Sequence, residues 1–293
     1  MKNPFRGAGV ALVTPFHKDY SIDFKALKKL VRYQIDNGID FLVVQGTTGE
    51  SPVLSMDEKL EVLKTVQEEN NGAVKIVFGV GGNDTMAVGE ILKNLPDGID
   101  GILSVSPYYN KPTQEGIFEH YKYIAGCTKL PIILYNVPGR TGSNVSAETT
   151  LKLAVIDNIV AMKEASGDLG QIMDIVLNKP EGFDVLSGDD AIVVPLMSIG
   201  VAGVISVSAN SYPKTFSDMV HFAQSNEYPK ASELHYELHN VTQLLFAEGN
   251  PGGVKVALEK LGIMEATMRM PLQPISQELR TKIEKETERL IKL

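Results

Sequence analysis

A lysine at the end of an apolar run is the residue of this sequence with the clearest chemical use. Lys163 closes the run 159–163, and a turn of small residues follows it at once. Alternate side chains of a β-strand face the same way, so Lys163 would continue the apolar face of Ile159 and Ala161. Burial favours the neutral amine, which can attack a ketone to form a Schiff base. The alternative is a solvated lysine paired with Glu164, the more common situation for lysine.

Three other places carry polar groups that suit a small acid. The segment 46–50, Gly-Thr-Thr-Gly-Glu, offers two hydroxyls and closely approachable backbone N–H groups, the donors that a carboxylate needs. Tyr135 ends another apolar run, and a phenol moves protons at neutral pH only when hydrogen bonds link it to a second acid or base. Arg140 lies in a loop, and a guanidinium can bind a carboxylate through two parallel hydrogen bonds. The ordinary alternatives are a turn, a core tyrosine and a loop salt bridge.

Eight apolar runs recur along the chain and supply the strands that must position these groups. They lie at 9–13, 41–45, 75–79, 101–105, 131–135, 159–163, 183–187 and 203–207. A segment of helical period separates each pair, which predicts an α/β fold with a parallel sheet; eight such units close as a (β/α)8 TIM barrel. A doubly wound open sheet is the alternative, but the glycine-rich turn at 79–84 lacks the last glycine of its phosphate-binding fingerprint. In such barrels the active site forms at the C-terminal ends of the strands.

Strand signals end near Lys214, and further helical segments follow. They lie at about 231–247, 253–261 and 277–293. We interpret them as the last barrel helix plus a C-terminal helical extension, and expect a barrel domain over 1–224 and the extension over 225–293.

Composition and charge exclude several classes of protein. The chain has 293 residues, 43% hydrophobic and 22% charged, so it can bury a large core. A formal net charge of -8 leaves no basic surface for nucleic acid or anionic lipid, although a local site for a carboxylate is compatible with it. The single cysteine, Cys127, cannot form an internal disulfide, and no apolar run approaches the ~18 residues of a membrane span. We therefore expect a cytoplasmic protein with no nucleic-acid or membrane partner.

Five motifs follow one another along the chain. They are 46–51 (GTTGES), 106–110 (SPYYN), 135–142 (YNVPGRTG), 163–167 (KEASG) and 187–190 (SGDD). In this order and spacing they resemble the dihydrodipicolinate synthase family, and the resemblance covers nearly the whole chain. It implies a pyruvate-dependent class I aldolase that condenses pyruvate with L-aspartate 4-semialdehyde in lysine and diaminopimelate biosynthesis. It also implies a homotetramer, as a dimer of dimers, without metal or organic cofactor, because the protonated imine is itself the electron sink.

The resemblance also implies a catalytic role for four residues. Lys163 would form the pyruvate imine, and Tyr135 would shuttle protons. Thr47 and Tyr109 would complete the relay of Tyr135. In the family the tyrosine that matches Tyr109 reaches into the neighbouring subunit's site, so the dimer would be the catalytic unit.

Four further residues would bind substrate. Thr48 and nearby backbone N–H groups would hold the pyruvate carboxylate, and Gly188 and Ile205 would present backbone groups near the imine. Arg140 would hold the carboxylate of the semialdehyde, and sugar-acid aldolases such as N-acetylneuraminate lyase generally lack this arginine. The alternatives are such an aldolase, or a barrel that binds a keto acid without catalysis. The intact catalytic set argues against the second alternative.

The chain departs from the family at two places. The cleft through which lysine inhibits some members is matched by Ser51, Asn83 and Tyr108. Met56 and Lys59, however, stand where inhibited members typically have histidines or other polar partners, and Ala87 replaces a glutamate. Near the C-terminus, Gly252 and Gly253 stand where an aliphatic residue and a second proline are common, which leaves the conformation of that loop open. Asp189 and Asp190 are interpreted as N-terminal residues of a helix.

Overall fold

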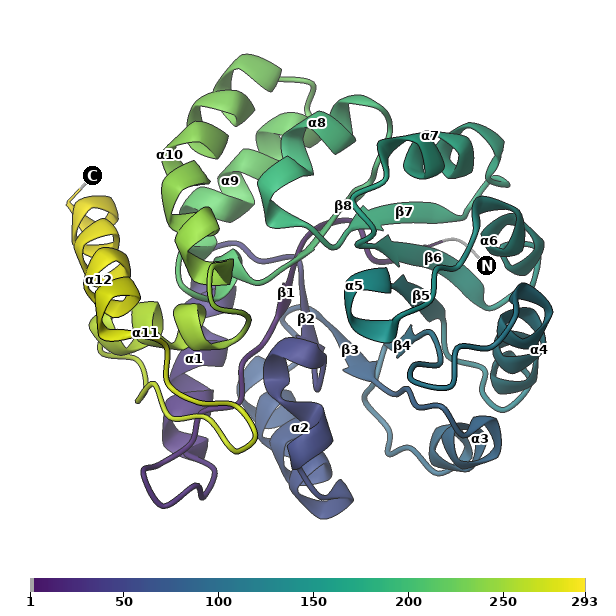
Figure 1. Cartoon of the computed structure of the whole chain (residues 1–293), viewed down its shortest axis with the longest axis horizontal. Helices are drawn as coiled ribbons and strands as arrows, with labels where there is room; N and C mark the ends of the chain where they lie inside the picture. The colour runs from purple at the N-terminus through teal and green to yellow at the C-terminus, as the bar shows by residue number, and fades with distance from the viewer. Residues whose placement is uncertain (1–2, 293) are drawn as a thin grey trace.

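A closed barrel of eight parallel strands forms the centre of the molecule (Figure 1), in a computed structural model that describes residues 3–292. The strands are β1 (Gly7–Ala11), β2 (Phe41–Val44), β3 (Lys75–Gly79), β4 (Gly101–Val105), β5 (Ile132–Asn136), β6 (Ile159–Glu164), β7 (Asp184–Ser187) and β8 (Gly203–Ser206). Each strand pairs with the next in chain order, and β1 pairs with β8 to close the barrel. The predicted TIM barrel is confirmed, and each predicted apolar run overlaps a strand.

Helices join consecutive strands and surround the barrel. Before the last strand lie α1 (Phe24–Asp36), η1 (Thr47–Gly49), η2 (Ser51–Val53), α2 (Met56–Asn70), α3 (Thr85–Lys93), α4 (Gln114–Ala125), α5 (Pro138–Thr141), α6 (Ala147–Leu153), α7 (Leu169–Asn178), η3 (Asp190–Ile192) and α8 (Val193–Ser198), the η elements being single 3-10 turns. Polar caps start several of them; α2 begins with a capping box in which Ser55 and Glu58 exchange hydrogen bonds. Within residues 3–292, no helix combines the length and apolarity needed to cross a membrane.

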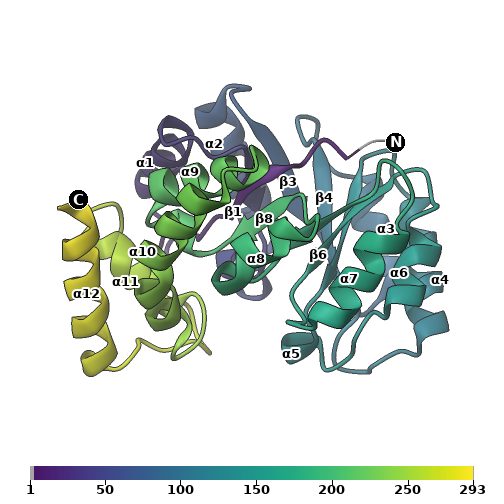
Figure 2. The same cartoon turned by 90° about the horizontal axis from the view of Figure 1, so that it is seen from above.

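The C-terminal part of the chain is helical. After β8 the described chain forms η4 (Ser208–Asn210), α9 (Pro213–Gln224), α10 (Tyr228–Phe246), α11 (Gly252–Lys260) and α12 (Gln277–Ile291). The last barrel helix is α9, because its buried face, including Phe216 and Val220, covers β1 and β8. The predicted segments at 231–247, 253–261 and 277–293 are α10, α11 and α12, so the prediction that they include the last barrel helix was wrong. Figure 2 shows α12 at the edge of the molecule opposite α4.

One irregularity changes which side chains enter the barrel. The pairing of β5 with β6 shifts register near the start of both strands. As a result Val160 and Ala161 pack in the apolar cluster inside the barrel, whereas Ile159 and Met162 pack in the outer layer under the helices. Simple alternation was therefore right in placing Ala161 on the face of Lys163 and wrong for Ile159, because β6 carries one extra residue opposite β5.

Candidate active site

Lys163 and Tyr135 lie side by side at the C-terminal ends of β6 and β5. The two residues are direct register partners, and Lys163 Nζ lies 4.4 Å from the centroid of the Tyr135 ring. Lys163 is 5% exposed and Tyr135 6%. The predicted burial of the lysine is therefore confirmed, and the face of an aromatic ring is next to its nitrogen.

Glu164, the alternative partner of Lys163, is engaged elsewhere. Its buried carboxylate accepts hydrogen bonds from Asn136 Nδ2 at 3.0 and 3.1 Å, from Ser166 N at 2.7 Å and from Gln171 Nε2 at 3.0 Å. Asn136 belongs to β5 and Glu164 to β6, so these bonds join the two strand ends. The contacts of Glu164 therefore hold the strand ends that carry the lysine and the tyrosine, and do not neutralise the lysine.

A cavity of about 640 Å³ opens at this end of the barrel and brings together most of the predicted site. Its lining includes Thr47, Thr48, Tyr135, Arg140, Lys163 and Gly188. Parallel strands all end on this side, which is why segments far apart in the sequence meet here. Thr47 and Thr48 start η1 in the turn that follows β2, where the backbone N–H groups of a first turn lack intrahelical partners. Arg140 stands on α5, exposed at the rim.

The remaining predicted binding residues lie close to the lysine or inside the barrel. A Cβ at Gly188 would lie 3.0 Å from Lys163 Cε and 2.6 Å from Ala165 Cβ, so only glycine leaves the lysine its place. Ile205 is buried in the apolar cluster inside the barrel and is not among the residues that line the cavity. Its predicted contact would therefore have to be made by the backbone.

The two aspartates after Gly188 have different surroundings. Asp189 caps η3 by accepting from Ala191 N at 2.9 Å, as predicted. Asp190 is the first residue of η3, also as predicted, and accepts from Val207 N at 3.0 Å and Ser208 N at 2.7 Å, which ties the end of β7 to the end of β8. Burial raises the pKa of Asp190, and these backbone hydrogen bonds oppose the rise.

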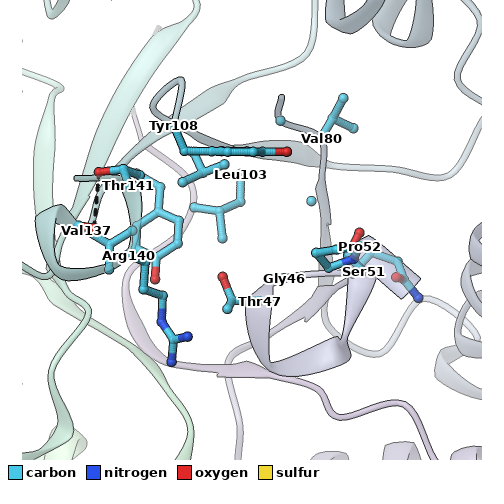
Figure 3. A pocket seen from close by; sticks show the side chains of 15 residues that line it. Gly46, Thr47, Ser51, Pro52, Val80, Leu103, Tyr108, Val137, Arg140 and Thr141 are labelled. Carbon is cyan, nitrogen blue, oxygen red and sulfur yellow. Dashed lines mark hydrogen bonds between the residues drawn. The ribbon is translucent and has the colours of Figure 1, made fainter. Parts of the chain in front are cut away.

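A second cavity of about 300 Å³ adjoins the first, and Thr47, Tyr135 and Arg140 line both. Figure 3 shows Thr47 between the Arg140 side chain and the Ser51–Pro52 segment. Of the predicted regulatory residues, Ser51 and Tyr108 line this second cavity. The third, Asn83, is exposed and lines neither cavity. Its Nδ2 donates a hydrogen bond to Tyr108 O at 3.3 Å.

Tyr109 does not join the other relay residues within one chain. It is 86% exposed, lines neither cavity and has a φ of 73°, a backbone conformation uncommon for a tyrosine. The structure therefore brings Thr47 and Tyr135 together and leaves Tyr109 on the surface.

Several lining residues were missed by the sequence analysis. The C-terminal part of the chain contributes Thr242, Gln243, Phe246 and Asn250. Asn250 Nδ2 donates to Thr48 Oγ1 at 2.9 Å, across 202 positions of sequence. Thr242 and Phe246 lie four residues apart on α10, and this helical spacing is the only signal by which they could have been grouped. Gln45 was also missed; it is buried beside the second cavity, and its amide atoms have no partner among the described residues.

Close packing explains the glycine pair that departs from the family pattern. Helix α11 begins at Gly252, where a Cβ would lie 2.7 Å from Ile275 Cγ2. At Gly253 a Cβ would lie 2.5 Å from the backbone oxygen of Leu245, on α10. Only glycine allows α10 and α11 to approach this closely. The loop whose conformation the sequence left undecided is therefore the closely packed start of α11.

Known proteins match the chain over nearly its whole length. Residues 4–290 match the dihydrodipicolinate synthetase family. A relative from Parabacteroides distasonis named 4-hydroxy-tetrahydrodipicolinate synthase is 53% identical over 271 residues, which are 92% of this chain and 91% of that protein. The crystal structure of dihydrodipicolinate synthase from Aquifex aeolicus is similar with a TM-score of 0.95 and 40% identity, over 98% of both chains. That of the chloride-inhibited dihydrodipicolinate synthase from Acinetobacter baumannii, complexed with pyruvate, has a TM-score of 0.94 and 41% identity, over 97% of this chain and 98% of that one.

Proposed function

Because the chain belongs to the dihydrodipicolinate synthetase family, we propose that it is a lyase that condenses pyruvate with L-aspartate 4-semialdehyde. The product is 4-hydroxy-tetrahydrodipicolinate, in lysine and diaminopimelate biosynthesis. The observation that carries the proposal is the buried Lys163 beside Tyr135, in a cavity that also holds two threonines and Arg140. The arginine at the rim favours this substrate over the sugar acids of N-acetylneuraminate lyase, and the complete lysine, tyrosine and threonine set favours catalysis over binding alone.

The first half of the reaction uses the deep end of the cavity. The neutral amine of Lys163 attacks the ketone carbon of pyruvate, and loss of water leaves an imine. Thr48 and the first backbone N–H groups of η1 hold the pyruvate carboxylate. Tyr135, which lines the same cavity as Thr47, carries the protons that the carbinolamine gains and loses. The aromatic face beside Lys163 is compatible with both the ammonium and the protonated imine.

The second half forms the carbon–carbon bond. Loss of a proton from the pyruvate methyl group turns the imine into an enamine, whose terminal carbon attacks the aldehyde carbon of the semialdehyde. Between these two steps the protonated imine takes up the electron pair of the broken C–H bond, so no metal or organic cofactor is required. Arg140 holds the semialdehyde carboxylate at the rim. The amino group of the semialdehyde then attacks the imine carbon, closes the ring and displaces Lys163.

We also infer a cytoplasmic homotetramer, built as a dimer of dimers. Two exposed apolar areas support two kinds of subunit contact. One is on α7, where Leu169, Met173 and Leu177 repeat at four-residue spacing and stay exposed. The other is beside the second cavity, where Tyr108 and Tyr109 are exposed. A partner that covers the second area would place Tyr109 near an active site, which fits its role in the relay.

Arg140→Ala tests the substrate assignment. With pyruvate and a panel of aldehydes, the wild type should prefer aspartate semialdehyde and fail to cleave N-acetylneuraminate. In the variant, kcat/KM for the semialdehyde should fall about 10- to 100-fold, because one charge-assisted contact worth roughly 1.5 to 3 kcal/mol is lost. Borohydride trapping of the pyruvate adduct should be unchanged, since the pyruvate carboxylate is held elsewhere.

The matched control is Arg140→Lys, which keeps the charge without the paired hydrogen bonds. Its kcat/KM for the semialdehyde should lie between the values for the wild type and for Arg140→Ala. A wild type that cleaves N-acetylneuraminate and ignores the semialdehyde would contradict the assigned substrate and leave the Schiff-base mechanism standing.

L-Lysine should inhibit weakly or not at all. By the resemblance, Ala87 leaves an ammonium group of the ligand without a counter-charge, and Lys59 adds a like charge at a position assigned to the cleft. Each lost charge-assisted contact costs about 1.5 to 3 kcal/mol, although solvent in an open cleft softens the effect of Lys59. Titration of L-lysine into the synthase assay, with D-lysine as the control, measures this. Half-inhibition by the L-isomer below about 1 mM, an affinity of ~4 kcal/mol, would contradict the prediction.

A further inference from the structure

Glu50 follows the active-site turn η1 and directs its side chain away from the substrate cavity. Its backbone is left-handed, with a φ of 56°, and its side chain lines neither cavity. The residue is only 3% exposed, and its Oε2 accepts a hydrogen bond from Arg269 N at 3.0 Å. A carboxylate buried this deeply requires a partner of opposite charge.

Lys255, on α11, is that partner. It is 0% exposed, and its Nζ lies 2.5 Å from Glu50 Oε1. The same nitrogen donates to Thr14 O at 2.9 Å and Thr267 O at 2.8 Å, and lies 4.4 Å from the centroid of the Phe16 ring. Burial lowers the pKa of Lys255 to about 8, while the Glu50 charge opposes the fall. One ammonium group thus joins α11 to the loop after β1, to the turn after β2 and to the chain that follows α11.

A buried ion pair of this kind is weak evidence for a stabilising role. Desolvation of two buried charges costs about as much as their attraction returns, and apolar residues of similar volume often serve equally well. The ammonium, however, donates to two backbone oxygens in fixed places and lies within ion-pair distance of Glu50 Oε1. The pair therefore specifies where Glu50 lies.

Further contacts hold the same turn. Thr14 Oγ1 donates to Gly49 O at 2.7 Å, and Asn250 Nδ2 donates to Thr48 Oγ1 at 2.9 Å. A Cβ at Gly49 would lie 3.1 Å from Leu12 O, so the turn also rests closely on the loop after β1. The turn is thus held by the barrel on one side and by the C-terminal helices on the other, while Thr47 and Thr48 line the cavity.

We propose that Lys255 and Glu50 are positioning residues for the turn that binds the keto-acid carboxylate. Through this pair the C-terminal helices determine where Thr47 and Thr48 stand. The inference rests on the proposed function and deepens it. Neither residue lines the cavity, so both would act on the substrate through the turn. Displacement of the turn should weaken pyruvate binding and leave the aldehyde site at Arg140, on α5, unchanged.

The double variant Lys255→Met/Glu50→Gln tests this. Lys255→Met alone would leave a buried unpaired carboxylate and could unfold the protein, whereas the double variant removes both charges at nearly constant volume. In the full-length double variant, the KM for pyruvate should rise about 10-fold or more, as for loss of a charge-assisted contact. The KM for the semialdehyde should not change. Glu50→Gln alone, which keeps the side-chain shape, should shift the KM for pyruvate in the same direction.

Lys260→Met is the matched control. Lys260 Nζ lies 2.5 Å from Glu288 Oε1, so this variant removes a paired cation from the same helix. It should change neither KM. A double variant or Glu50→Gln with the wild-type KM for pyruvate would overturn the positioning role. A fall in kcat with both KM values unchanged would also overturn it, because lost folded protein acts in that way. A wild type that gives no pyruvate adduct with borohydride would instead contradict the proposed function, and this inference with it.

Discussion

Borohydride added together with pyruvate should attach a reduced, pyruvate-derived group to Lys163 and abolish activity. The imine is the only link between this nitrogen and the substrate, and its reduction makes that link permanent. Peptide mass mapping locates the adduct. Lys255, the other buried lysine of the described residues, lines neither cavity and should remain unmodified.

Lys163→Arg should remove both the adduct and the activity. A guanidinium stays protonated in proteins and cannot form the imine, yet it keeps a cation beside the Tyr135 ring. The fold should therefore survive, as circular dichroism and thermal unfolding would show. An adduct at another lysine, or turnover by this variant near the wild-type rate, would remove the basis of the mechanism.

Tyr135→Phe should lower kcat by about 10²- to 10⁴-fold, the range for loss of a positioned general acid or base. The substitution keeps the ring that lies under Lys163 and removes only the hydroxyl, so binding of pyruvate should change little. Steady-state kinetics measures the effect on kcat, and the rate of borohydride trapping shows whether imine formation is the slowed step.

Tyr212→Phe is the matched control for this variant. Tyr212 is also a buried tyrosine, but its hydroxyl shares a hydrogen bond of 2.8 Å with Thr287 Oγ1 and lines neither cavity. Its loss should cost about 1 to 3 kcal/mol of unfolding free energy and leave kcat unchanged. Equal kcat values for the two variants would show that the Tyr135 hydroxyl carries no proton in the rate-limiting step.

Local sequence patterns were sufficient to predict the barrel and the end of it that holds the site. Apolar runs of strand length alternate with segments of helical period, and both patterns depend only on near neighbours in the chain. Because all strands of a parallel barrel end on one side, Lys163, Tyr135 and Thr47 could be placed at one mouth without any tertiary contact. The cavity confirms this grouping. The roles of these residues were implied by the resemblance to a family, and they stay predictions.

Tertiary structure alone decided the details that depend on contacts between distant parts of the chain. The extra residue in β6, which moved Ile159 to the outer layer, comes from the pairing with β5 and leaves no local mark. Asn250 meets Thr48 across 202 positions, and Lys255 meets Glu50 only after the C-terminal helices fold back against the barrel. The burial of Lys255 and Glu50 was not predicted, because it depends on the partner of opposite charge that the fold brings to each of them. For that reason the sequence by itself determined where the chemistry lies, and only the folded chain determined what holds it in place.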